Sequence, residues 1–290
     1  MKLASLALLS ALIAVPAVAE PIYINIGTNF GGNANKHAGP TTTGLLDELQ
    51  FNYTSYSTVF DSSNDGLLGV GDTITSTGGL KGTGFNFNTL TDGYLKNSIT
   101  SLLPQAAGPF GPSDNGFKTN WFLSFGFDNL VGTLVSGGGV QWLSGTISFY
   151  ATTDINTCFG ANDSSCFKRL FDMNVTTGGN IPSGTVLTGN VQNYNYNAAD
   201  KFNSVFAGDV FNFAGNTFKG QGASFRVDQN VTDLPAPTAW NPVTKTWTLA
   251  SAEHRGGISF ATAKVSEPTT LAVLGLGLMG LFYRRRSQKA

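Results

Sequence analysis

Charged residues are scarce in this chain of 290 residues. Lys, Arg, Asp and Glu make up 12% of it, about half of the share in an average soluble domain. The 17 basic residues nearly balance the 18 acidic ones, so the chain lacks the positive charge that nucleic-acid binding needs. The chain has only two Cys and two His, which excludes a disulfide-rich scaffold, and both histidines lie far from the cysteines in sequence, which disfavours a zinc site.

Glycine and phenylalanine are abundant instead, with 36 and 22 residues. Residues 48–60 alternate strictly between two faces, which indicates a long half-buried strand. One face of this strand is expected to carry Phe51, Tyr53, Ser55, Ser57 and Val59. Shorter strands are predicted over residues 21–27, 73–77, 121–128, 132–135, 146–151, 170–176, 185–194, 202–213, 224–228, 246–250 and 257–263, with a helical turn at 45–49 and turns at 137–139 and 178–180. Many short strands without a long amphipathic helix predict an all-β fold, a single antiparallel β-sandwich-like domain.

The N-terminal end has the pattern of a secretory signal peptide. Lys2 precedes an apolar run over residues 3–15, and Ala17-Val18-Ala19 is a small-residue cleavage pattern. We therefore expect residues 1–19 to be removed by signal peptidase, leaving an exported β-rich domain over residues 20–265.

The C-terminal tail, residues 266–290, combines three short elements. Ser266-Glu267-Pro268 comes first, an apolar run over residues 271–283 follows, and Arg284-Arg285-Arg286 ends the pattern. The run predicts a short transmembrane helix, although a relaxed span takes about 20 residues. Because arginines resist crossing to the outside, the tail is expected to anchor the chain transiently in the inner membrane with its end in the cytoplasm.

This tail resembles the PEP-CTERM sorting signal of Gram-negative bacteria. The family usually has Pro-Glu-Pro, where this chain has Ser266, Glu267 and Pro268. The resemblance implies that an exosortase, a membrane peptidase, cuts near this tripeptide and that the body reaches the cell surface or the extracellular matrix. It also implies a setting of exopolysaccharide, biofilm or floc. A plain tail anchor is the alternative.

The exported body carries a mild negative charge. Five of the 17 basic residues but only one of the 18 acidic ones lie outside residues 20–265, which leaves the body at about −5. This charge gives no reason to expect a nucleic-acid partner, and it suits a divalent cation better.

The cysteines are Cys158 and Cys166. Export to an oxidising compartment favours a disulfide between them. A zinc site would need further ligands, and a redox site would need Cys-x-x-Cys. We therefore expect a structural disulfide that closes a short loop.

Residues 61–72 have the register of a twelve-residue calcium loop. Asp61, Ser63 and Asp65 would be ligands at positions 1, 3 and 5, Leu67 would offer its carbonyl, and Asp72 would be the ligand at position 12. Gly66 stands at the sharp turn and Gly69 at the water position. The loop resembles EF-hand and dockerin loops over these residues alone, and an ordinary Asp/Asn/Gly turn is the alternative. Calcium is the one cofactor that the sequence suggests.

No catalytic pattern is apparent. His37 and His254 lack a nucleophile elbow nearby, and His254 is expected on a polar loop before the last strand. Tyr194 and Tyr196 could stack on sugars, although exposed tyrosines on a polar loop explain them as well. The sequence therefore predicts a non-enzymatic surface or matrix protein. The alternatives are a lectin-like module and a secreted carbohydrate-active enzyme, which would need two acids in one cleft.

Overall fold

The computed structural model describes ten stretches of the chain. They are residues 19–32, 35–80, 97–104, 112–153, 167–181, 184–193, 210–215, 218, 222–230 and 234–262. Every element with described bounds is a strand, so the prediction of an all-β fold is confirmed.

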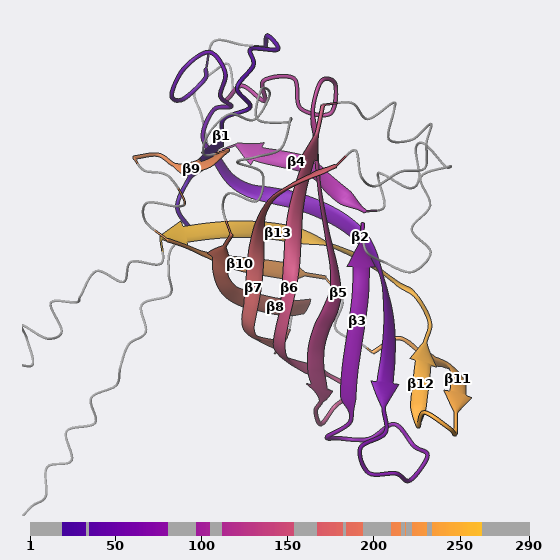
Figure 1. The fold of residues 1–290 in the computed structure, drawn as a ribbon. Helices are drawn as coiled ribbons and strands as arrows, with labels where there is room; N and C mark the ends of the chain where they lie inside the picture. Colours follow the sequence, from indigo (N-terminus) through magenta and orange to yellow (C-terminus); the bar gives the residue numbers. More distant parts are fainter. Residues whose placement is uncertain are drawn as a thin grey trace, which may run out of the picture.

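The strands form one antiparallel sheet (Figure 1). They are β1 (Ile22–Ile24), β2 (Leu46–Phe60), β3 (Thr73–Gly79), β4 (Ser98–Pro104), β5 (Phe122–Leu134), β6 (Val140–Thr152), β7 (Lys168–Ile181), β8 (Gly184–Gln192), β9 (Phe211–Phe213), β10 (Ala223–Gln229), β11 (Pro237–Asn241), β12 (Thr246–Leu249) and β13 (Ala252–Thr262).

Eight of these strands close into a barrel. Their order is β2-β13-β10-β8-β7-β6-β5-β3, and β3 pairs with β2 to complete the ring. The prediction of a β-sandwich is therefore wrong. Alternation along each strand looks the same in both folds, because both bury one face of every strand. Closure depends instead on which strands pair, and the pairing of β2 with β13 joins residues about 200 positions apart.

The alternation that predicted β2 is confirmed, and the strand is longer than expected. It covers 15 residues, and all five residues from Phe51 to Val59 on the predicted inner face are buried. The predicted helical turn at residues 45–49 is wrong, because Leu46 pairs with Ile22 and Leu49 with Ile258 in the sheet. The predicted turn at residues 178–180 is also wrong, since β7 continues through it beside β8.

Aromatic side chains fill the upper half of the barrel, the end that carries β1 and β9 in Figure 1. Phe149 stacks on Phe171 with ring centroids 4.9 Å apart. Phe260 lies 5.0 Å from Phe218 and 6.1 Å from Phe211. Such pairs add stabilisation beyond the burial of their area. This aromatic packing is the main core of the molecule.

A buried amide closes the upper end. The Asn115 side chain donates to the carbonyls of Thr28 and Thr41, at 2.9 and 3.1 Å, and accepts from the Phe30 amide. Its own carbonyl accepts from the indole of the buried Trp121. One residue thereby joins two loops that would otherwise leave backbone groups unpaired above the core.

The two predicted processing segments lie mostly outside the described residues. Residues 1–18 of the signal peptide are not described, nor are residues 263–290, so the predicted C-terminal hydrophobic helix is not seen. Across the part of the chain that is described, no helix has the length and apolar character needed to cross a membrane. Glu20, the expected first residue of the mature chain, donates its backbone N–H to Phe260 and accepts from the Thr262 hydroxyl at 2.6 Å.

The aromatic core gives a first prediction. Phe149→Ala should lower the free energy of unfolding by about 4 kcal/mol, because it leaves a cavity in a packed interior. Phe60→Ala is the matched control, since that ring is 46% exposed and should change stability by less than about 0.5 kcal/mol. Urea denaturation measures both values. Equal losses for the two variants would contradict the position of the core.

Candidate binding sites

The lower half of the barrel holds a pocket instead of a filled core. Its walls carry small inward side chains, among them Ser55, Ser57 and Ser76, where the upper half has aromatic rings. An eight-stranded barrel is just wide enough to be filled by side chains or to hold one small ligand. Small residues at inward positions therefore leave a space, which measures about 50 Å³ as the volume open to the centres of water molecules.

The pocket lies between two apolar layers. Tyr53 and Phe127 belong to the aromatic core above it, with ring centroids 5.5 Å apart. Ile74 and Val140 belong to a second, smaller apolar cluster at the lower end, and Leu234 packs against that cluster. The polar pocket is thus enclosed by hydrophobic contacts on both sides.

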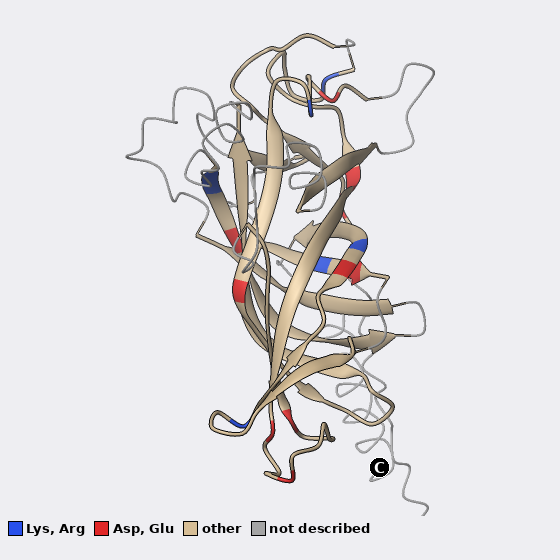
Figure 2. Ribbon diagram, turned by 90° about the vertical axis from the view of Figure 1, so that its right-hand side faces the viewer, with Lys and Arg blue, Asp and Glu red and all other residues tan. Residues whose placement is uncertain are grey.

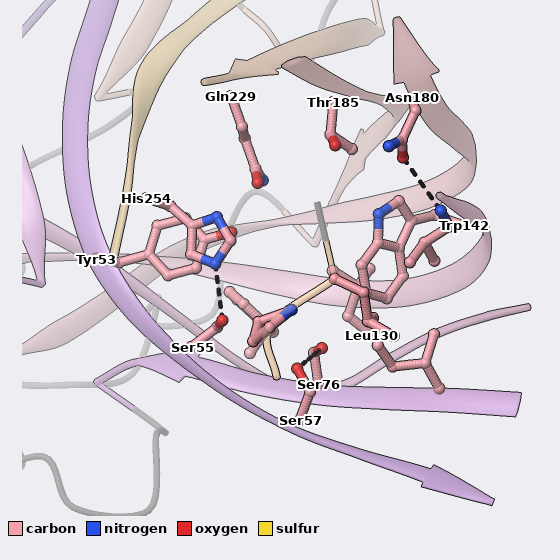
Figure 3. A pocket seen from close by; sticks show the side chains of 15 residues that line it. Tyr53, Ser55, Ser57, Ser76, Leu130, Trp142, Asn180, Thr185, Gln229 and His254 are labelled. Atoms are coloured by element: carbon pink, nitrogen blue, oxygen red, sulfur yellow. Dashed lines mark hydrogen bonds between the residues drawn. The ribbon is translucent and has the colours of Figure 1, made fainter. Parts of the chain in front are cut away.

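His254 is the most unusual group in the pocket (Figure 3). It lies opposite Tyr53 in the pairing of β13 with β2, and the two rings stack at 4.5 Å and 11°. Its Nε2 is 2.7 Å from the Ser55 hydroxyl. Its Nδ1 is buried and has no hydrogen-bond partner among the residues that the structure describes. A buried ring nitrogen without a partner is costly, so this atom points to something that the pocket accommodates.

Burial determines the protonation states of His254 and Tyr53. Removal from water lowers the pKa of His254 from 6.5 to about 4, so the ring is neutral near pH 7. Burial likewise raises the pKa of the Tyr53 hydroxyl far above its ordinary value, and hydrogen bonding to Gln229 opposes this only in part. The pocket therefore presents neutral polar groups.

The prediction that His254 lies on a polar loop before the last strand is wrong. β13 begins at Ala252, and His254 faces inward from it. The available signal was in β2, where Ser55 and Ser57 share the inner face with Phe51 and Tyr53. Hydroxyls on an otherwise apolar buried face indicate a polar pocket within a core. The other histidine, His37, is exposed and contacts the Ala214 carbonyl at 3.0 Å.

A second hollow, the outer groove, lies on the outside of the barrel along β2, β13 and β10. It offers about 490 Å³ to the centres of water molecules. Its lining includes Glu48, Gln50, Asn52, Thr100, Asp228, Gln229, Asn230 and Arg255. These side chains provide amides, a hydroxyl and charged groups, which together donate and accept hydrogen bonds.

Neither glycine that lines the outer groove has room for a side chain. A Cβ on Gly257 would lie 2.1 Å from a carboxylate oxygen of Glu48, and one on Gly256 would lie 1.8 Å from the Asp228 carbonyl. Burial, followed by the nearby Asp228 charge, raises the pKa of Glu48. Asp228 itself is paired with Arg226, whose guanidinium donates two hydrogen bonds at 2.8 and 2.7 Å.

The predicted calcium loop connects β2 to β3 at the lower end of the barrel (Figure 1). Asp61 accepts from the backbone N–H groups of Asn64 and Gly66, at 2.6 and 2.7 Å, and from the Ser63 hydroxyl. Asp72 accepts from two further backbone N–H groups, of Ser62 at 2.9 Å and of Gly69 at 2.8 Å.

Asp65 and Leu67 complete the loop. The Asp65 carboxylate accepts from the Leu67 N–H at 2.8 Å, and Gly66 has the positive φ expected at the sharp turn, +76°. The side chains of Asp65 and Leu67 are exposed. Among the described residues, no three His, Cys, Asp or Glu side chains gather in a way that could hold a metal ion. The calcium site stays a prediction, and the structure gives Asp61 and Asp72 a role in the turn itself.

The pKa of Asp61 agrees with a structural role for this side chain in the turn. Burial acts to raise the pKa of Asp61, but the hydrogen bonds from Gly66, Ser63 and Asn64 outweigh it and hold the pKa below its ordinary value. The ionised carboxylate is therefore the form that organises the loop. Figure 2 shows acidic residues in this loop, whereas much of the ribbon has no charged residue.

The remaining predicted site residues lie outside the described residues. They are Cys158 and Cys166, whose disulfide stays a prediction, Tyr194 and Tyr196, and the sorting residues Ser266, Glu267, Pro268, Arg284, Arg285 and Arg286.

The fold defines a closed antiparallel β-barrel with a polar internal pocket and an open outer groove. The chain carries the PEP-CTERM protein-sorting motif, whose family model matches residues 264–286. This motif confirms the resemblance of the tail and indicates export to the cell surface or extracellular space of Gram-negative bacteria, with processing by exosortase. No curated protein and no solved structure matches the chain.

Stability should depend on pH through His254. Because its pKa is about 4 in the folded chain and 6.5 when unfolded, the unfolded state binds more protons between these values. Stability is therefore full above pH 6.5 and falls by up to about 3 kcal/mol as the pH falls through this window. Urea denaturation of wild type and His254→Gln across the window measures the difference. His37→Gln, at an exposed position, is the matched control, and a variant curve parallel to wild type would contradict the burial of His254.

The loop at residues 61–72 gives a separate prediction. Asp72→Ala should lower the free energy of unfolding by about 2 kcal/mol without any metal, because two backbone N–H groups lose a charged acceptor. Asp65→Ala is the control, since its carboxylate is exposed and its removal should lower the free energy of unfolding less.

Melting of the wild-type protein with calcium and with magnesium tests whether this loop binds calcium. A rise in melting temperature specific to calcium supports the calcium site, and an unchanged temperature rejects it.

Proposed function

We propose that the exported body is a non-enzymatic component of an exopolysaccharide matrix or biofilm, and that it binds polysaccharide along the outer groove. Signal peptidase would release residues 1–19, and the tail would hold the chain in the inner membrane until exosortase acts. The sorting motif supports the route, and the outer groove is the observation that carries the binding role.

Two features of the outer groove suit a sugar chain. It is open to solvent, and its lining mixes hydrogen-bond donors with acceptors. Sugar hydroxyls both donate and accept, so side-chain amides such as those of Gln50 and Asn52 are suitable partners. Water-mediated bonds extend such contacts where the groove is wide.

A carbohydrate-active enzyme is the second candidate, because two carboxylates line the same groove. Glu48, whose pKa is raised, could serve as an acid, and Asp228 could serve as its partner. Against this, Asp228 is held by two hydrogen bonds from Arg226. A carboxylate so engaged is less available to attack a substrate, and the binding role is therefore preferred.

Cosedimentation of residues 20–262 with exopolysaccharide from a culture that makes the protein tests the proposal. Gln50→Ala and Asn52→Ala should each weaken binding by about two- to tenfold, the effect of losing one neutral hydrogen bond. Thr58→Ala is the control, because Thr58 is exposed on the same strand beyond the groove. The absence of binding would overturn the proposal. Release of reducing ends that Glu48→Gln abolishes would favour the enzyme.

A further inference from the structure

We propose that the barrel pocket is a binding site for a small neutral polyol, a hydroxylated molecule of about the size of glycerol. This goes beyond the polysaccharide role, which uses the outer face of the barrel. The argument rests on the charge of the pocket, on its unpartnered polar atoms and on its size.

No charged side chain lines the pocket among the described residues. The fifteen lining residues include no Asp, Glu, Lys or Arg, and their one titratable imidazole is neutral near pH 7. A carboxylate or an ammonium ligand would lose its hydration without meeting an opposite charge, and that loss is large. The pocket therefore selects against ions.

His254 requires a partner that can both donate and accept. If the ring donates from Nε2 to Ser55, Nδ1 is left as an acceptor; if Ser55 donates to Nε2, Nδ1 carries the proton. A hydroxyl satisfies Nδ1 in either tautomer, whereas a carbonyl satisfies only the second. The unpartnered nitrogen thus points to a hydroxyl group.

A second group that could bind a ligand, besides His254, lies across the pocket. The hydroxyls of Ser57 and Ser76 are 2.5 Å apart in a cross-strand pair, so one donates to the other. The proton of the accepting hydroxyl is not used in this bond and is available to a ligand oxygen. Figure 3 shows this pair and His254 on different sides of the same space. Two separated anchors of this kind suit a molecule with more than one hydroxyl.

The size of the pocket limits the ligand. The space open to the centres of water molecules is about 50 Å³, which is room for more than one water and suits a molecule of about the size of glycerol. Trp142 and Leu130 supply apolar wall against which a carbon chain can pack.

Titration of the ¹⁵N-labelled body with glycerol, acetate and methylammonium, followed by NMR, tests the proposal. Glycerol should cause a saturable shift of the His254 ring nitrogens, with the larger change at Nδ1. The two ions, both small enough to enter a pocket that takes glycerol, should leave these signals unchanged. Shifts with the ions as large as those with glycerol would overturn the proposal. No saturable shift with glycerol would also overturn it and would leave a pocket that holds water only.

Variants separate the pocket from the rest of the barrel. The double variant Ser55→Ala/His254→Phe removes the imidazole and its partner together, so the Ser55 hydroxyl is not left unpaired beside Tyr53, and it should bind glycerol at least tenfold more weakly. Backbone amide shifts around the pocket are the readout, because the ring nitrogens are absent. Ser148→Ala is the matched control, since Ser148 is a buried serine outside the pocket whose hydroxyl also has no partner, and it should bind as wild type does. Unchanged affinity in the double variant would reject the role of His254.

Discussion

The pairing of β2 along both of its edges is the interaction on which the rest of this structure depends. On one edge β2 pairs with β4 and then β3, and on the other with β13 and then β12. This double pairing closes the sheet and leaves no free edge within the ring of eight strands. It also places His254 opposite Tyr53, and so creates the polar pocket, while the outer faces of β2 and β13 form the outer groove.

The barrel is filled in two different ways because its inward residues differ in size. In the upper half, Phe149, Phe171 and Phe260 pack against one another within the aromatic core. In the lower half, serines stand at equivalent inward positions and leave space for solvent or a ligand. The same closed sheet thereby provides stability at one end and a polar pocket at the other, since burial of aromatic area dominates folding and small hydroxyls contribute little to it.

The two hollows differ in the chemistry that they can recognise. The outer groove is open and lined by both neutral and charged groups from several strands, which suits a chain molecule. The pocket is small, partly open and without formal charge at neutral pH, which suits one small neutral molecule. The PEP-CTERM motif indicates that the chain is exported to the cell surface or the extracellular space.

The sequence by itself determined what is local. The tail at residues 264–286 and the strict alternation of β2 depend on order and spacing along the chain, and both were predicted correctly. Only the tertiary structure decided that the sheet closes, that β7 runs through Gly178 and Gly179, and that His254 faces inward. The physical reason is that a period of two defines which face of a strand is buried, but it does not define which strand lies beside it in the sheet. The contact between Ser55 and His254 spans 199 positions, and nothing in either local sequence specifies it.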